Sequence, residues 1–518
     1  MKKKLFLIAV PLMAILFFMS QQSTANNVNG FFADPGSFEI LSSYQGRNNV
    51  LKVDSSKTNW YIASYSLARY RRKPITIEFS ADVRREGSAG YLSWQVNNAP
   101  YYPGIASIEN ASPNVWHNIS GKRIITPTDN NPILYLTNYG INSPTNIYIA
   151  NPTVTITEGD PLTPDLSLTP LKKIYENHFL IGNITNDDGG LMYGKYLDIM
   201  KHHYNIVTCN VTYPVQLMPL TKGGAYRFTA ANNTINIARR NKIPVHGHVL
   251  VWHEETLAWI FEGTREEVIQ NMNNYITTVL RNFRGKINSW DVVNEAIKYS
   301  VTASDAQGDW RNCVRRSTPD MPNPWFDKLG ADYIELAFRF ARAADPNITL
   351  YYNDYDLENP NKAEAVRKMI QDINDRYKKE TGGTRNLIEG VGSQAHHQDI
   401  NLNLNDVRTS LERLISLGIE VAITELDVRV KNEYIKGVRM DSIMSERDAI
   451  AQAVFYARIM NLYKEYSAHI TRVSFWGIDD NTSFISTSNP CLFDWKLNAK
   501  PAFHAVSDPD GFLRQNRR

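Results

Sequence analysis

The sequence is poor in cysteine, with only Cys209, Cys313 and Cys491 among 518 residues. Three cysteines cannot all pair within one molecule, and their wide spacing does not match a metal-binding motif. The composition therefore excludes both a fold built on disulfides and a cysteine-based metal centre. We expect mostly buried cysteines that act as small hydrophobic side chains, and at most one disulfide can form.

Long apolar runs are also missing. The apolar run at residues 5–19 is shorter than the roughly 20 residues that span a bilayer. It follows three lysines at residues 2–4 and precedes the small residues 23–25, which is the pattern of a signal peptide. The sequence predicts that residues 1–25 direct export and that the mature protein is secreted, either extracellular or periplasmic, without a membrane partner.

The chain also has little net charge. The formal net charge is +3, and removal of residues 1–25 with their three lysines brings it to zero. A neutral chain without basic clusters lacks the electrostatic surface that nucleic acids require. We therefore expect no nucleic-acid partner, and we expect a monomer.

Residues 26–157 have the pattern of an all-β domain. Residues 75–83 alternate apolar and polar side chains, as a half-buried strand does, and Gly, Pro and Asn turns separate further strand candidates. This pattern predicts a β-sandwich. The alternation places Trp94 in its core and Tyr91, Gln95 and Asn97 on the opposite face. The further strand candidates are residues 91–96, 131–137 and 146–157.

A polar linker at residues 158–170, which contains three prolines, separates this domain from residues 171–518. In the second region, apolar strand candidates alternate with amphipathic helices, such as the one that begins with the capping box at 264–267. Eight such repeats predict an α/β fold, a (β/α)8 TIM barrel with its active site at the carboxyl ends of the strands. A doubly wound sheet would need a phosphate-binding glycine loop, which Gly390-Val391-Gly392 does not supply. The strand candidates are residues 179–184, 206–209, 243–251, 287–293, 348–353, 388–394, 421–426 and 472–477.

Two of these strands deliver a carboxylate at their ends. The apolar run 287–293 ends in Asn294 and Glu295, and the run 421–426 carries Glu425 near its end. Hydrolysis of a glycosidic bond requires two carboxyl groups, one as acid and one as nucleophile or base. For either stretch alone, an ordinary glutamate at a strand end is an equal alternative.

Polar and aromatic residues follow other strands too. His248, His253 and His396 could be read as metal ligands, but no set of three ligands is implied and the two carboxylates already supply the chemistry. We therefore expect no metal and no cofactor.

Together these motifs resemble glycoside hydrolase family 10, whose principal members are endo-β-1,4-xylanases. The resemblance covers residues 171–510 and implies that Glu295 is the general acid/base and Glu425 the nucleophile of a retaining mechanism. The other implied roles are a hydrogen bond from Asn294 to the sugar 2-hydroxyl, orientation of Glu425 by His396, and a sugar subsite lined by His248, Trp252, Gln394 and Trp476. The motifs that carry it are residues 246–253, 290–296, 351–355, 392–396, 423–427, 475–477 and 500–503.

The chain departs from this family at two places. Where the family usually has Glu-Asn-x-Met-Lys after the second strand, residues 210–214 read Asn-Val-Thr-Tyr-Pro. The family's usual tryptophan after the eighth strand corresponds to Phe484. These changes leave the reaction intact and put the substrate in question.

The N-terminal region resembles the carbohydrate-binding sandwiches that often precede xylanase domains. The likeness rests on the strand pattern, on Trp116-His117 and on the closing strand at 147–152, although Ala150-Asn151 replaces an acidic pair common in such modules. Tyr91, Gln95 and Asn97 are the candidates for a sugar-binding surface.

The sequence therefore predicts a secreted retaining glycoside hydrolase that cleaves internal β-1,4 bonds of xylan. One alternative is a retaining β-glycanase for a decorated xylan or another β-linked glycan. Another is a non-catalytic protein that binds a polysaccharide. A protein that only binds a polysaccharide gains nothing from keeping both Glu295 and Glu425.

Overall fold

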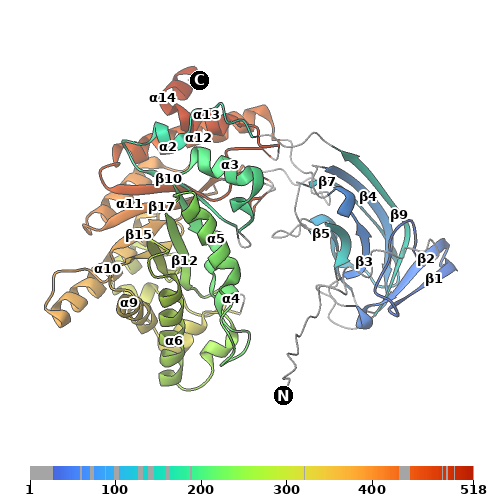
Figure 1. Ribbon diagram of the computed structural model, residues 1–518, viewed down its shortest axis with the longest axis horizontal. Helices are drawn as coiled ribbons and strands as arrows, with labels where there is room; N and C mark the ends of the chain where they lie inside the picture. Colours follow the sequence, from blue (N-terminus) through green and yellow to red (C-terminus); the bar gives the residue numbers. More distant parts are fainter. Residues whose placement is uncertain are drawn as a thin grey trace, which may run out of the picture. The chain divides into compact units, whose positions relative to one another are not determined.

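The computed structural model describes residues 27–516 except 59–60, 71–74, 88, 98–103, 126–131, 138–144, 159–163, 187–188, 320, 399, 431–443, 481, 486–487 and 495. The predicted signal peptide lies outside the described residues, as does part of the predicted linker. The chain divides into two compact units between residues 161 and 162 (Figure 1). The exact domain boundaries at residues 157 and 171 stay predictions.

The first unit is all-β. Its described strands form two antiparallel sheets, in the orders β1-β2-β9-β4-β7 and β3-β8-β5-β6. The sheets pack face to face, since the Phe79 ring on β4 lies 4.5 Å from the Trp94 ring on β5. The strands are β1 (Phe38–Tyr44), β2 (Arg47–Asp54), β3 (Tyr61–Ser66), β4 (Ile75–Arg85), β5 (Gly90–Asn97), β6 (Gly104–Ala111), β7 (Trp116–Ile125), β8 (Ile133–Thr137) and β9 (Asn146–Glu158).

Alternation in the sequence explains this packing. On β4 the apolar positions from Ile75 to Val83 are buried, and the polar residues between them are more exposed. Trp94 is fully buried, which confirms its predicted place in the core. Gln95 faces the other way and accepts a hydrogen bond of 2.8 Å from the Tyr135 hydroxyl. The side chains of Tyr91 and Asn97 lie outside the described residues.

The second unit is a barrel of eight parallel strands, as predicted. Consecutive strands pair in order, and the barrel closes because the first strand pairs with the last, Leu180 beside Arg472. A short strand, β16 (His396–His397), adds to β17 beyond the barrel. The barrel strands are β10 (Leu180–Ile184), β11 (Ile206–Cys209), β12 (Val245–Val251), β13 (Ser289–Asn294), β14 (Thr349–Asp354), β15 (Gly390–Ser393), β17 (Glu420–Val428) and β18 (Ile470–Phe475).

Helices surround the barrel strands (Figure 1). Helix α6 begins with the predicted capping box, in which Thr264 and Glu267 bind each other's backbone N–H groups. None of the helices in the described part of the chain is long and apolar enough to cross a bilayer. The α-helices are α2 (Leu171–Ile174), α3 (Gly194–His203), α4 (Pro214–Leu217), α5 (Thr229–Arg240), α6 (Arg265–Phe283), α7 (Ala303–Gln307), α8 (Pro324–Leu329), α9 (Asp332–Ala344), α10 (Pro360–Thr381), α11 (Leu404–Ile415), α12 (Glu446–Glu465), α13 (Pro501–Ser507) and α14 (Pro509–Gln515).

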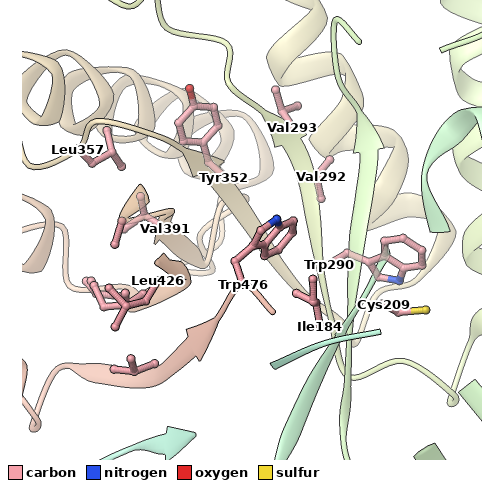
Figure 2. Packing of buried hydrophobic residues seen from close by; sticks show 14 of the residues in the cluster. Ile184, Cys209, Trp290, Val292, Val293, Tyr352, Leu357, Val391, Leu426 and Trp476 are labelled. Carbon is pink, nitrogen blue, oxygen red and sulfur yellow. The ribbon is translucent and has the colours of Figure 1, made fainter. Parts of the chain in front are cut away.

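Each unit has its own apolar core. In the barrel, Figure 2 shows side chains from several strands packed together, among them Ile184, Trp290, Val391 and Leu426. All three cysteines are buried with free thiols. They therefore behave as the small apolar side chains that the composition predicts. This rigid core fixes the strand ends on which the candidate site is built.

Candidate active site

Glu295 and Glu425 lie at the carboxyl ends of two barrel strands. Glu295 directly follows β13 and has a left-handed backbone, with φ of +55°. Its N–H donates to the carbonyl of Asn353 at 2.9 Å. The N–H of Glu425, on β17, donates to the carbonyl of Gln394 at 2.9 Å. Backbone bonds to neighbouring strand ends thus hold both residues.

A chain of side-chain amides connects the two carboxyl groups. Gln394 Nε2 donates to Glu295 Oε1 at 2.9 Å and to Asn294 Oδ1 at 3.3 Å. Asn353 Nδ2 donates to the same Asn294 oxygen at 2.9 Å and to Glu425 Oε1 at 2.8 Å. The amide nitrogen of Asn294 has no hydrogen-bond partner among the described residues. It is therefore available to donate to a substrate.

The surroundings of Glu295 favour its protonated form. Burial raises the pKa of Glu295, and the negative charges of Asp354 and Glu425 raise it further. Hydrogen bonds from Gln394 and from Trp252 Nε1, the latter 2.9 Å to Glu295 Oε2, oppose this shift without cancelling it. A carboxyl group with a raised pKa is suited to donate a proton near neutral pH.

Glu425 is almost fully buried, with 4% exposure, and it contacts a histidine. His396 Nε2 lies 2.9 Å from Glu425 Oε2, and its Nδ1 lies 2.8 Å from Asp427 Oδ2. Burial alone would lower the pKa of His396, but the charges and hydrogen bonds of Asp427 and Glu425 raise it to about 10. His396 is therefore an imidazolium at neutral pH, and its two ring N–H groups donate to Glu425 and Asp427.

A buried carboxyl group, that of Asp291, holds the His248 ring. Its Nδ1 lies 2.8 Å from Asp291 Oδ2, and His246 Nε2 lies 3.0 Å from the same oxygen. Although burial opposes ionisation of Asp291, the two histidines hold the pKa of this carboxyl well below its usual range. The charge of Asp291 fixes the orientation of the His248 ring.

Aromatic rings enclose these polar groups. The Trp476 ring, 8% exposed, lies 5.6 Å from the His248 ring and 5.9 Å from the His396 ring. Figure 2 shows Trp476 among the apolar side chains of the barrel. The structure thus joins all eight predicted site residues in one set of contacts, which comprises His248, Trp252, Asn294, Glu295, Gln394, His396, Glu425 and Trp476. His253 is also buried, but neither of its ring nitrogens has a hydrogen-bond partner among the described residues.

The two departures from the family pattern lie beside this set. Asn210 Nδ2 donates to the Tyr213 hydroxyl at 3.2 Å, and the Tyr213 ring lies 5.5 Å from His248 and 5.8 Å from Trp252. Phe484 is 53% exposed, and its ring lies 5.4 Å from that of His396. At both departures an aromatic ring therefore lies beside a histidine of the site, Tyr213 beside His248 and Phe484 beside His396. No group of three or more His, Cys, Asp or Glu side chains in the described ranges could hold a metal ion.

Sequence reasoning missed Asn353, Asp427 and Asp291 as members of the site. Asp427 lies two residues after Glu425 on the same strand, so the alternation of a strand could have indicated that both face the same side. Asn353 lies near the carboxyl end of the fifth strand, where the barrel fold places functional residues. Asp291 lies inside an apolar strand, and a buried carboxylate of this kind needs a partner.

A (β/α)8 barrel that holds two carboxyl groups at its strand ends has the arrangement of a glycoside hydrolase. Residues 170–509 match the model of glycosyl hydrolase family 10, and the chain belongs to this family. This confirms the resemblance drawn from the motifs.

Relatives and solved structures agree with this assignment. The chain is 33% identical over 362 residues to endo-1,4-beta-xylanase A of Thermotoga neapolitana, covering 67% of this chain and 32% of that protein. It is 30% identical over 349 residues to a beta-1,4-xylanase of Dictyoglomus thermophilum, covering 66% and 91%. A family 10 xylanase from termite gut with a bacterial Ig-like domain superposes with a TM-score of 0.60 at 30% identity, covering 82% and 94%. The chain spans about a third of the length of the first curated relatives it matches.

Proposed function

We propose that this protein is a secreted retaining endo-β-1,4-xylanase that cleaves internal bonds of xylan by double displacement. The observation that carries this proposal is the difference between the surroundings of two carboxyl groups that a chain of side-chain amides connects. Glu295 has a raised pKa, whereas Glu425 accepts from an imidazolium and an amide. The names of the relatives supply the substrate class, and the pattern of residues 1–25 supports export.

In the first step, a Glu425 oxygen attacks the anomeric carbon while Glu295 gives its proton to the departing glycosidic oxygen. The carbon–oxygen bond to the leaving sugar breaks as the bond to Glu425 forms. In the second step, Glu295, now a carboxylate, takes a proton from water as that water displaces Glu425. Asn294 donates its amide hydrogen to the sugar 2-hydroxyl in both steps.

The anomeric configuration of the first product tests the mechanism. Because two displacements at one carbon restore its configuration, we expect the first product formed to be the β-anomer. Proton NMR during the first minutes of hydrolysis, before mutarotation, measures this directly. Initial release of the α-anomer would contradict the roles of both glutamates.

The residues around Tyr213 predict an altered substrate preference. A hydrogen bond to a charged group contributes about 1.5–3 kcal/mol, and this chain lacks the Glu and Lys of the family at that position. The Tyr213 hydroxyl accepts from Asn210, and the Tyr213 ring lies beside that of Trp252, so neither the charge of a Glu nor that of a Lys is present there. We expect weaker activity on plain linear xylan and a relative preference for a decorated xylan or another β-linked glycan. Comparison of kcat/KM on unsubstituted and side-chain-bearing xylo-oligosaccharides measures this preference. Clearly faster cleavage of the unsubstituted series would contradict the prediction.

The N-terminal sandwich is proposed to bind carbohydrate. Its core is separate from that of the barrel, and every proposed catalytic residue lies after residue 171. Residues 171–518 alone should therefore fold and cleave soluble substrate at the rate of the full chain. Activity on insoluble xylan should fall, because the sandwich raises the local concentration of substrate. An isolated barrel that is inactive on soluble oligosaccharide would show that the sandwich contributes to the site.

A further inference from the structure

The backbone that follows Glu295 is bound by residues of the next strand. The N–H groups of Ala296 and Ile297 both donate to the Tyr352 hydroxyl, at 3.1 Å and 3.2 Å. The Ile297 N–H also lies 3.3 Å from Asp354 Oδ2, and the Tyr352 hydroxyl donates to the same oxygen. Figure 2 shows Tyr352 extending from its strand with the hydroxyl at the far end. Two neighbouring side chains of β14 therefore hold the two residues after Glu295.

These bonds act on a strained position. A residue other than glycine in the left-handed region is strained and persists only where its surroundings enforce it. Arg315 binds the same turn from the other side, with Nε 3.1 Å from the Glu295 carbonyl and its own N–H 2.8 Å from the Ala296 carbonyl. The φ of +55° at Glu295 is thus fixed by contacts on both sides of the turn.

A fully buried ion pair anchors this arrangement. Asp354 Oδ1 lies 2.8 Å from Lys362 Nζ on helix α10, and both side chains have 0% exposure. The same ammonium lies 3.7 Å from the centre of the Tyr355 ring. Burial of two charges is costly, and such a pair often adds little or nothing to stability compared with apolar residues of similar size. A role in the site is therefore a better reason for its presence than stability.

We propose that Tyr352, Asp354 and Lys362 form a positioning unit that aims the Glu295 carboxyl group at the leaving-group oxygen. The inference rests on the proposed function of Glu295 as general acid, and it adds residues that do not touch the substrate. Tyr352 holds the backbone turn, Asp354 orients the Tyr352 hydroxyl, and Lys362 neutralises the buried Asp354.

The positioning unit also affects the pKa of Glu295. The charge of Asp354 raises the pKa of Glu295 together with burial and the charge of Glu425. Among the described residues, Glu295 also interacts electrostatically with Arg315, His248 and Tyr355. Loss of the Asp354 charge should therefore lower the pKa of Glu295, and the alkaline limb of the kcat/KM profile should move to lower pH.

Tyr352→Phe tests the positioning directly, because it removes only the hydroxyl that accepts from Ala296 and Ile297. We expect kcat on xylo-oligosaccharides to fall about 10-fold or more, a part of the 10²–10⁴-fold that general acid catalysis supplies, with KM nearly unchanged. An aryl β-xylobioside with a good leaving group needs little protonation, so its rate of glycosylation should be spared. Tyr275→Phe is the matched control, since this buried tyrosine on α6 has a hydroxyl without a hydrogen-bond partner among the described residues.

The double variant Asp354→Asn/Lys362→Met tests the electrostatic part without leaving an unpaired buried lysine. We expect it to remain folded by circular dichroism and to shift the alkaline limb in the same direction, because the charge of Asp354, and not that of Lys362, is among the main causes that raise the pKa of Glu295. Equal loss on both substrates in Tyr352→Phe, or an unmoved limb in the double variant, would overturn the positioning unit. Such results in an enzyme whose wild type cleaves xylan leave the proposed function standing, whereas a wild type inactive on every β-glycan would overturn both.

Discussion

Glu425→Ala is expected to abolish turnover on every glycoside, including aryl glycosides with good leaving groups. Alanine has no oxygen that can attack the anomeric carbon, so the covalent intermediate cannot form. The change also leaves the imidazolium of His396 facing a site without its anion, although Asp427 still pairs with the ring at 2.8 Å. Initial rates on xylo-oligosaccharides and on an aryl β-xylobioside measure the loss.

Glu420→Ala provides the control for this variant. Glu420 begins the same strand, β17, but it is exposed at the opposite end of the barrel from Glu425. It should retain activity, so that loss in Glu425→Ala cannot be ascribed to any glutamate on the strand. Substantial turnover by a folded Glu425→Ala protein would mean that another group is the nucleophile.

The barrel could be predicted from the sequence because its signals are local. The eight apolar runs match the observed strands within a few residues, and the predicted run 287–293 appears as Ser289–Asn294. A strand that ends in Asn294 and Glu295 indicates where its side chains lie once the barrel is assumed. The same reasoning placed Trp94 in the sandwich core, where it is fully buried.

The partners of the catalytic side chains could not be predicted in this way. Asn353 bridges Asn294 and Glu425, but its contacts depend on the register between three strands. The sequence does not predict the burial of Lys362, because a lysine on a helix is usually exposed to solvent. Only the fold brings Lys362 and Asp354 into contact. Long-range polar contacts of this kind have no periodicity that a sequence can reveal.

The contacts of Tyr213 are a further feature that the sequence could not predict. The sequence shows only that residues 210–214 lack the Glu and Lys of the family. In the structure Asn210 Nδ2 donates to the Tyr213 hydroxyl, and the Tyr213 ring lies 5.8 Å from that of Trp252. The two substituted residues thus contact each other through the Asn210 amide nitrogen, whereas Asn210 Oδ1 is buried without a hydrogen-bond partner among the described residues.

Glu295→Ala should behave differently from Glu425→Ala, because it removes proton transfer but leaves the nucleophile. On xylan and xylo-oligosaccharides we expect kcat/KM to fall by roughly 10²–10⁴-fold, the contribution of a general acid. On an aryl β-xylobioside with a good leaving group, glycosylation should be largely spared, since that oxygen departs without protonation. Hydrolysis of the intermediate also loses its base, so a burst of aryl product should precede a slow steady state.

A small anion distinguishes the loss of base catalysis in the second step from the loss of acid catalysis in the first. Azide attacks the intermediate without a base, so it should restore steady-state turnover of the aryl substrate in Glu295→Ala and yield a β-glycosyl azide. Glu255→Ala is the matched control, because Glu255 also has a positive φ, of +49°, and an exposed side chain outside the catalytic contacts. It should show neither the burst nor the rescue. Equal losses on natural and aryl substrates in Glu295→Ala, without a burst, would mean that Glu295 is not the group that protonates the leaving oxygen.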